Sequence, residues 1–192
     1  MPITINGNGT ITGLSVGGLP DGSVDRDTLA SGAKGSVLQV QTTNNTTLHA
    51  KSNSTSWADV SGLSCAITPT AASNKVIVSI TLCVSKNDNH GLLGRVYRDS
   101  TLIGGGVGDQ GNHEDNCWWN IRTAGEYSPM PYNVTYVDTI PSDWSSGAIT
   151  YKVQVRTTWT GIYFAINGSV MDGNNDHESP GMSTIVLTEI AA

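Results

Sequence analysis

The sequence predicts an all-β protein built as an antiparallel β-sandwich, jelly-roll-like, on three observations. Several segments alternate apolar and polar side chains with period two, as strands with one buried face do. Short joins rich in turn-forming residues separate these segments. Charged residues make up only 14% of the 192 residues, and Gly, Ser, Thr and Asn are abundant, which is typical of β proteins with many turns. A sandwich also protects the edges that so many strands create.

Residues 1–35 are expected to form an extended N-terminal arm and joint, and residues 36–192 the β-sandwich knob. The apolar residues of the arm stand alone or at period two, and the glycines between them disfavour a helix. So little apolar surface cannot offset the entropy of ordering the segment alone. Other copies or a partner are therefore expected to order it. The expected attachment and trimerisation residues are Ile3, Ile5, Ile11, Leu14, Val16, Leu19, Val24 and Leu29.

The first half of the knob is expected to begin with a strand over Val37–Gln41, followed by two shorter segments at 46–50 and 57–60. The most regular strand of this half is Lys75–Val84. Its inward-facing residues are Val76, Val78, Ile80, Leu82 and Val84, and Ser79 and Thr81 fall on the other face. Leu63–Thr68 precedes it, and the turn residues 69–74 predict that the two strands form a hairpin.

The second half is expected to contain a hairpin around Arg98–Ser100 and a clear strand over Ala148–Thr158. In that strand Tyr151, Val153 and Val155 face inward, while Lys152, Gln154 and Arg156 face outward. The remaining strands are expected at 117–122, 134–139, 162–166 and 183–190, the last with Ile185 and Leu187 on one face.

Charge and hydropathy exclude several classes of partner. The net charge is −6, with ten Lys and Arg residues in all and no basic stripe, so neither nucleic acid nor an anionic membrane surface is expected as a partner. No apolar run reaches the ~18 residues of a membrane span, and membrane insertion is not expected. The N-terminus lacks a signal peptide, and three widely spaced cysteines indicate reduced thiols in a protein made in a cytosol.

The chain is expected to be non-enzymatic, because it contains no nucleophile elbow, phosphate-binding loop or zinc-protease motif. The alternative is a sugar hydrolase with a pair of acids, but the internal repeat expected of a long depolymerase scaffold is missing. Its candidate carboxylates are Glu114, Asp115, Asp172, Asp176 and Glu178.

No metal ion or other cofactor is expected. Asp172–Asp176 begins like a calcium loop, but His177 stands where glycine is required and Ser183 where an acidic residue is required. A solvated polar loop is the simpler interpretation. The alternative is a transition-metal site that uses His113 with Cys117, or His177 with Glu178.

Glycan contact is the binding function that the polar loops favour. Residues 104–116 and 168–180 carry Asn, Asp, His and Glu side chains, which hydrogen-bond sugar hydroxyls well. Nearby aromatic side chains could stack on a pyranose ring; these are Trp118, Trp119, Trp144, Trp159 and Tyr163. The candidate receptor-facing residues are His113, Glu114, Asp115, Trp144, Asp172, Asn174, Asn175, Asp176 and His177.

The five tryptophans must also fill much of the core, because the chain has one Phe. Strand alternation sends one of Trp118 and Trp119 inward and the other outward. An outward tryptophan serves a subunit interface or a ligand platform, or is exposed by chance. Trp144, in the loop 141–146, is the aromatic residue most expected to be exposed.

Several stretches, which together cover about half of the chain, carry a family resemblance. The arm reads NGNGTITGLSVGGLPDGSVD over residues 6–25. The knob begins with GSVLQV at 35–40, STSWADVSGLS at 54–64 and ITPTAASNKVIV at 67–78, and it ends with TYKVQV at 150–155 and STIVLTEIAA at 183–192. These stretches resemble bacteriophage fibre-type virion structural proteins, such as short tail fibres and head fibres with a C-terminal β knob.

The resemblance implies a homotrimer in the virion, made in the cytoplasm of a bacterial host. The arm would attach to another virion protein, the tail hub or the major capsid protein, and the knob would contact a host-surface glycan. The alternative is a capsid decoration or head-fibre protein that binds and stabilises the shell. The resemblance carries over no catalytic residue. Independently, three copies of the arm around an axis would stack its isolated aliphatic side chains together.

Overall fold

The computed structural model of the chain describes residues 4–5, 11–12, 37–104, 117–122, 129–171 and 180–192. The chain divides into two compact units, Met1–Ser36 and Val37–Ala192. In the first unit, β1 (Thr4–Ile5) pairs antiparallel with β2 (Ile11–Thr12), and Ile5 lies opposite Ile11. The other expected attachment residues (Ile3, Leu14, Val16, Leu19, Val24 and Leu29) lie outside the described residues.

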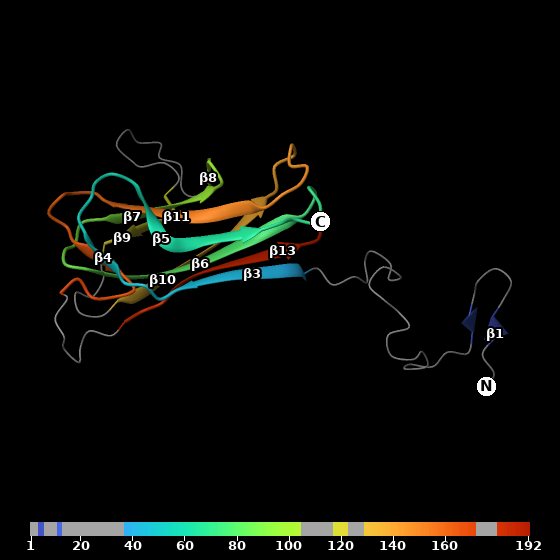
Figure 1. The fold of residues 1–192 in the computed structure, drawn as a ribbon, viewed down its shortest axis with the longest axis horizontal. Coiled ribbons are helices and arrows are strands. Elements are labelled where there is room, and N and C mark those ends of the chain that lie inside the picture. The colour runs from blue at the N-terminus through green and yellow to red at the C-terminus, as the bar shows by residue number, and fades with distance from the viewer. Residues whose placement is uncertain (1–3, 6–10, 13–36, 105–116, 123–128, 172–179) are drawn as a thin grey trace. The chain divides into compact units, whose positions relative to one another are not determined.

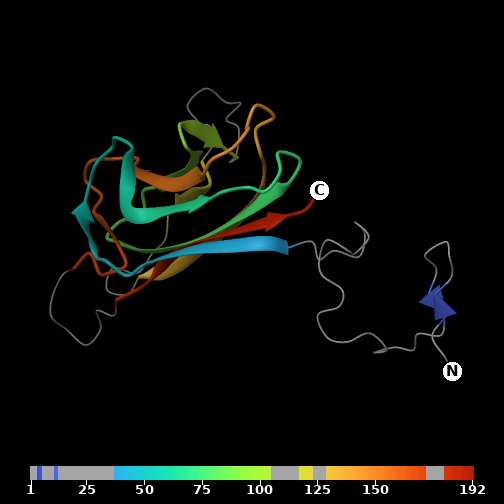
Figure 2. The ribbon, with the colours of Figure 1, turned by 45° about the vertical axis from the view of Figure 1, so that its right-hand side comes forward.

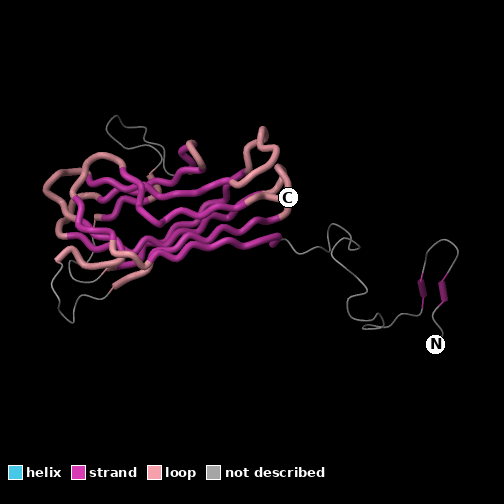
Figure 3. The backbone as a smooth tube through the Cα atoms, viewed as in Figure 1, coloured by secondary structure: helices cyan, strands magenta, loops and turns pink. Residues whose placement is uncertain are grey.

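The second unit is a sandwich of two antiparallel sheets (Figure 1). The first sheet contains β3 (Val37–Asn45), β4 (His49–Ser52), β6 (Lys75–Lys86), β10 (Met130–Thr139), β12 (Phe164–Ile166) and β13 (Ser183–Ile190). The second contains β5 (Ala58–Ile67), β7 (Leu92–Arg98), β8 (Thr101–Ile103), β9 (Trp119–Ile121) and β11 (Ile149–Thr157). The described residues contain strands, turns and loops and no helix (Figure 3), which confirms the all-β prediction.

Each sheet is four strand positions wide. In the first sheet, β10 pairs along one edge of β6. Strands β13 and β12 pair one after the other along the opposite edge of β6. On their far side, β3 pairs with β13 and β4 pairs with β12. In the second, the order is β5, β11, β7, and then β8 and β9 along one edge of β7. The chain crosses from one sheet to the other between β4 and β5, at both ends of β6, and at both ends of β10 and β11.

The apolar faces of both sheets meet in one core, as the alternation predicts. All five inward-facing residues of β6 (Val76, Val78, Ile80, Leu82 and Val84) are buried, and so are Tyr151, Val153 and Val155 of β11 and Ile185 and Leu187 of β13. Burying a side chain of this size stabilises a fold by roughly 1.5–3 kcal/mol. The three strands whose period-two pattern is most regular thus supply a large part of the core, and β5, β7, β9 and β12 also contribute to it.

The expected hairpin between residues 63–68 and 75–84 is wrong. β5 pairs with β11 of the second sheet, whereas β6 lies in the first, so residues 68–74 cross between the sheets. Two amphipathic strands joined by a short turn give the same sequence pattern in a hairpin and in a sandwich corner. The hairpin around Arg98–Ser100 is confirmed: Arg98 pairs with Thr101, and Asp99 takes a φ of 52° in the tight turn.

Strand β10 begins at Met130, earlier than expected, and includes Pro131. Proline has no N–H to donate, so it is found in edge strands. Among the described residues β10 pairs only with β6, and Pro131 is therefore compatible with its edge position.

Cys65, Cys83 and Cys117 form no disulfide, and the first two are buried. Burial raises the pKa of the Cys83 thiol. Within the described ranges, no helix is long and apolar enough to cross a membrane.

The two ends of the sandwich carry different connections (Figure 2). The entry end holds the start of β3, the corner 68–74 and the end of β13, because Val37 and Lys75 both pair with Ile190. The opposite end, which we call the loop end, holds residues 53–57 between β4 and β5, 87–91 between β6 and β7, and 158–163 between β11 and β12.

Candidate functional site

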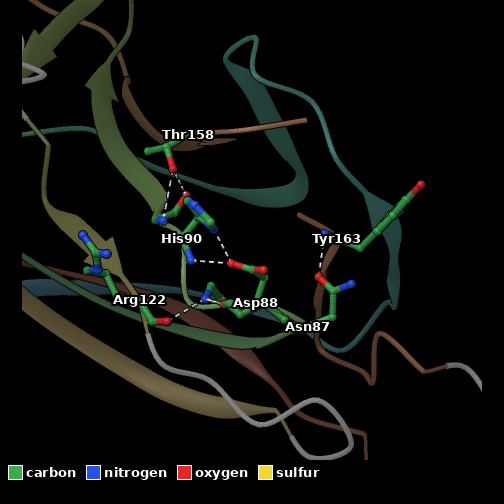
Figure 4. Close-up of polar contacts among 8 residues, drawn as sticks. Asn87, Asp88, His90, Arg122, Thr158 and Tyr163 are labelled. Carbon is green, nitrogen blue, oxygen red and sulfur yellow. Dashed lines mark hydrogen bonds and ion pairs between the residues drawn. The ribbon is translucent and has the colours of Figure 1, made fainter. Parts of the chain in front are cut away.

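The candidate site lies at the loop end, where residues 87–91 and 158–163 come together (Figure 4). The first segment is Asn-Asp-Asn-His-Gly, and the second contains Trp159 and Tyr163. Both segments leave buried strands: Lys86 at the end of β6 and Thr157 at the end of β11 are buried. The sandwich core therefore fixes the positions at which these loops begin.

Asp88 shapes the first loop. Its Oδ1 accepts a hydrogen bond of 2.8 Å from the backbone N–H of His90 and also contacts Nδ1 of the same histidine (Figure 4). The hydrogen bond from the His90 ring, followed by that from its backbone, lowers the pKa of the Asp88 carboxyl. An aspartate that binds the backbone two residues on forms an Asx turn, so Asp88 holds His90 at the loop tip while both side chains stay accessible to solvent.

Lys86 ties the same loop to the end of β9. Its side chain is buried, and Nζ donates to the carbonyl oxygen of Arg122 at 2.7 Å and to that of Asp88. Burial lowers the pKa of Lys86, which the nearby Asp88 charge partly counters. A buried ammonium must be hydrogen-bonded to be tolerated, and these two carbonyl groups are its partners.

Thr158 fastens the two loops to each other. Its Oγ1 accepts from the N–H of Gly91 at 3.1 Å, and its own N–H donates to the Gly91 carbonyl at 2.9 Å (Figure 4). Asn87 makes a second join, because its N–H donates to the Tyr163 carbonyl at 3.2 Å and its Oδ1 accepts from the Tyr163 N–H at 2.9 Å. The loops therefore form one hydrogen-bonded surface.

Gly91 permits this close approach. A Cβ at residue 91 would lie 2.6 Å from Oδ1 of Asn120 and 3.1 Å from Cγ2 of Thr158. A side chain at residue 91 would force the exposed Asn120 amide to move and would crowd Thr158 of the second loop.

The aromatic side chains of this surface face solvent. Trp159 is 56% exposed, more than any other described tryptophan, and Tyr163 is 37% exposed. The His90 ring meets the Trp159 ring edge-on, with ring centres 4.7 Å apart and an angle of 71° between their planes. The loop-end surface is defined by Asn87, Asp88, His90, Trp159 and Tyr163.

This arrangement suits a neutral polyhydroxylated ligand. An exposed indole offers a flat apolar face to the C–H groups of a sugar ring, and the carboxylate, amide, imidazole and phenol groups beside it hydrogen-bond hydroxyl groups. The described residues contain no group of three or more His, Cys, Asp or Glu side chains placed to hold a metal ion.

Most of the expected receptor-facing residues lie outside the described residues: His113, Glu114, Asp115, Asp172, Asn174, Asn175, Asp176 and His177. Residues 105–116 connect β8 to β9, and residues 172–179 fall between β12 and β13. Of the flanking strands, β8 and β9 share one edge of β7, and β12 and β13 share one edge of β6.

Trp144 is the aromatic residue most expected to be exposed, but it is half-buried, and Trp159 is the exposed tryptophan instead. The Trp144 ring packs against the core, and its Nε1 donates to the Gly147 carbonyl at 3.1 Å. It lies between β10 and β11 at the entry end, so it is not part of the loop-end surface. The internal hydrogen bond to a nearby turn explains why this loop tryptophan faces inward.

Of the adjacent tryptophans, Trp119 is the inward one and is buried. Trp118 is half-buried, packs against the core and against the Tyr136 ring, and donates to the Ile103 carbonyl at 2.7 Å. Trp118 therefore covers the sandwich edge between β9 and β10.

The sequence predicts Trp159 and Tyr163 as possible stacking residues, but it does not single out Asn87, Asp88 or His90. The signal for these three is a polar Asn-Asp-Asn-His run directly between two buried strands, a composition that marks a turn as readily as a site.

No family model matches the chain, and no curated protein matches it either.

Proposed function

We propose that the chain is a bacteriophage virion structural protein, a homotrimeric fibre or adhesin. In this proposal residues 1–35 attach it to another virion protein, and the knob contacts a glycan of the host surface without catalysis. The observation that carries the proposal is the exposed Trp159 ring, braced edge-on by His90 on a hydrogen-bonded surface. A solvent-facing tryptophan held by fixed loops is a feature of ligand-binding surfaces.

The strand order supports the proposal. The orders β3–β13–β6–β10 and β5–β11–β7–β8, with repeated crossing between sheets, match a jelly roll, an architecture found in viral and lectin domains. Fold alone does not assign function, so the proposed glycan contact depends mainly on the loop-end surface. This surface lies opposite the end at which β3 begins, which suits a knob that is attached through its N-terminal side.

An adsorption experiment tests the proposal. Host cells are incubated with purified full-length protein before infection by the virus that encodes it. We expect the protein to slow adsorption in proportion to its concentration, and the Trp159→Ala variant to slow it much less. A folded protein without effect on adsorption, together with density for this chain on the capsid surface, would support the capsid decoration alternative instead.

A further inference from the structure

The outward face that β3, β13, β6 and β10 form in the first sheet is almost free of charge. The strand registers place its outward residues in four rows that cross β3, β13, β6 and β10 in that order. The rows are Val37–Ile190–Lys75–Thr139, Val40–Thr188–Ile77–Val137, Thr42–Val186–Ser79–Thr135 and Asn44–Thr184–Thr81–Asn133. Lys75, at the entry end, is the one ionisable side chain in these four rows, which we call the uncharged face.

Aliphatic side chains on this face are exposed in the single chain. Val40 is 51% and Val137 is 49% exposed, at the two edges of the same row. Solvent-facing strand positions are normally polar, and a contiguous apolar surface marks an interaction site. Exposed valines on a sheet face are therefore evidence for a partner.

Two pairs of polar residues on the face form hydrogen bonds within it. Thr81 Oγ1 donates to Oδ1 of Asn133 at 2.6 Å, and the hydroxyl oxygens of Ser79 and Thr135 are 3.1 Å apart. A buried polar group is costly only when it lacks a hydrogen bond. Covering this face would therefore leave these side chains satisfied.

The outward face of the second sheet differs in charge. There Lys152 pairs with Asp59 at 2.9 Å, Gln154 donates to Asp59 at 2.6 Å, and the Arg95 guanidinium lies 4.1 Å from the centre of the Trp57 ring. The chain thus places networks of charge outward on one sheet and almost none on the other. Charge depletion distinguishes the cores of protein interfaces from other surfaces.

We propose that the uncharged face is the surface through which copies of this chain pack in the trimer, an inference that rests on the proposed function. Each copy carries a net charge of −6, so copies repel one another unless they meet over a surface without acidic groups. The uncharged face is four strands wide, with strands about 4.8 Å apart, and about eight residues long, at ~3.3 Å per residue. These dimensions give a flat area of roughly 500 Å². That is the same order as the ~800 Å² that each partner buries in a standard interface.

The test measures the mass of full-length variants by light scattering. Val40→Lys on the edge strand β3 and Val186→Lys on the inner strand β13 put a charge into the face. The matched controls are Ala66→Lys on the edge strand β5 and Thr150→Lys on the inner strand β11, whose outward positions lie on the second sheet. We expect wild type and both controls at three times 20.2 kDa, and both face variants at the monomer mass.

Circular dichroism tests whether each variant is folded. Of the two face positions, Val40 is the more exposed, so Val40→Lys disturbs the packing of the knob less than Val186→Lys does. Folded face variants that remain trimeric would overturn the inference and leave the proposed trimer intact. A monomeric wild-type chain would overturn both.

Discussion

Arg98 and Asp138 join the two sheets through one ion pair. Nη1 of Arg98, on β7, lies 2.8 Å from each carboxylate oxygen of Asp138, on β10, and the Tyr151 hydroxyl donates to Oδ2 of Asp138 at 2.8 Å. Burial, followed by the Asp138 charge, raises the pKa of Tyr151, so its hydroxyl remains a donor. These contacts tie the edge strand β10 to the second sheet near the entry end.

We expect Asp138→Asn to lower the free energy of unfolding by about 3 kcal/mol, because it leaves a mostly buried guanidinium without its counter-ion. Asp59→Asn is the matched control: Asp59 pairs with Lys152 at the surface, where such pairs contribute about 1 kcal/mol or less. Urea unfolding measures both variants. Equal losses would contradict the view that the Arg98–Asp138 pair holds the sheets together.

Glu189 gives a pH-dependent prediction. Its buried carboxylate accepts hydrogen bonds from Gln39 at 2.6 Å, from the N–H and hydroxyl of Thr70 at 2.7 and 2.9 Å, and from Asn74 at 2.7 Å. Burial alone would raise its pKa, but these hydrogen bonds together lower it below the ordinary value of 4.5. The ionised form therefore stabilises the fold above pH 4.5, and this contribution is lost as the pH falls through the lower pKa of the folded state.

We expect Glu189→Gln to cost about 2 kcal/mol at pH 7, the usual contribution of hydrogen bonds to a charged group. The difference between wild type and variant should shrink as the pH falls below 4.5, because wild type loses the stabilisation that the variant already lacks. Unfolding in urea between about pH 7 and about pH 3 measures it. A difference that is constant over this range would refute the assignment.

Gly91→Ala is expected to disturb the loop-end surface, because its Cβ would lie 3.1 Å from Cγ2 of Thr158 in the second loop and 2.6 Å from Oδ1 of Asn120, which must move. Overpacking of this kind costs about 1–3 kcal/mol, and we expect glycan binding to weaken with it. Gly161→Ala is the control, since a Cβ there has no atom within 4 Å. Thermal unfolding and binding are measured together. If both variants behave like wild type, close packing at residue 91 does not shape the loop-end surface.

Deletion of residues 1–30 should abolish incorporation into virions and leave the knob folded, because residues 37–192 form a compact unit of their own. Virion incorporation is read by immunoblot of purified particles, and folding by circular dichroism. Loss of the folded knob would mean that the arm belongs to the core of the fold.

The regular strands could be predicted from the sequence because their alternation reports burial directly. Val76 to Val84 and Tyr151 to Val155 occupy the expected positions in the core. Strand partners could not be predicted in the same way: the turn 69–74 has the composition of a hairpin turn and yet crosses between sheets. Pairing depends on contacts between distant residues, which local periodicity does not record.

The candidate site was less predictable than the fold. Exposure of a loop tryptophan depends on its local partners: Trp144 turns inward toward Gly147, whereas Trp159 faces solvent beside His90. The sequence places both in polar loops of similar composition. The join between Thr158 and Gly91, 67 residues apart, is likewise not visible in either segment alone.

The most direct test of the central claim is the affinity of the full-length protein for surface polysaccharide extracted from the bacterial host, measured for wild type, Trp159→Ala and Tyr136→Ala. Tyr136 is an aromatic residue on β10 that is 36% exposed and lies away from the loop end. We predict that Trp159→Ala weakens binding at least about tenfold, as loss of a central aromatic residue does, and that Tyr136→Ala binds like wild type. Equal affinity of wild type and Trp159→Ala, with both proteins folded, would contradict the claim that the loop-end surface binds a host glycan.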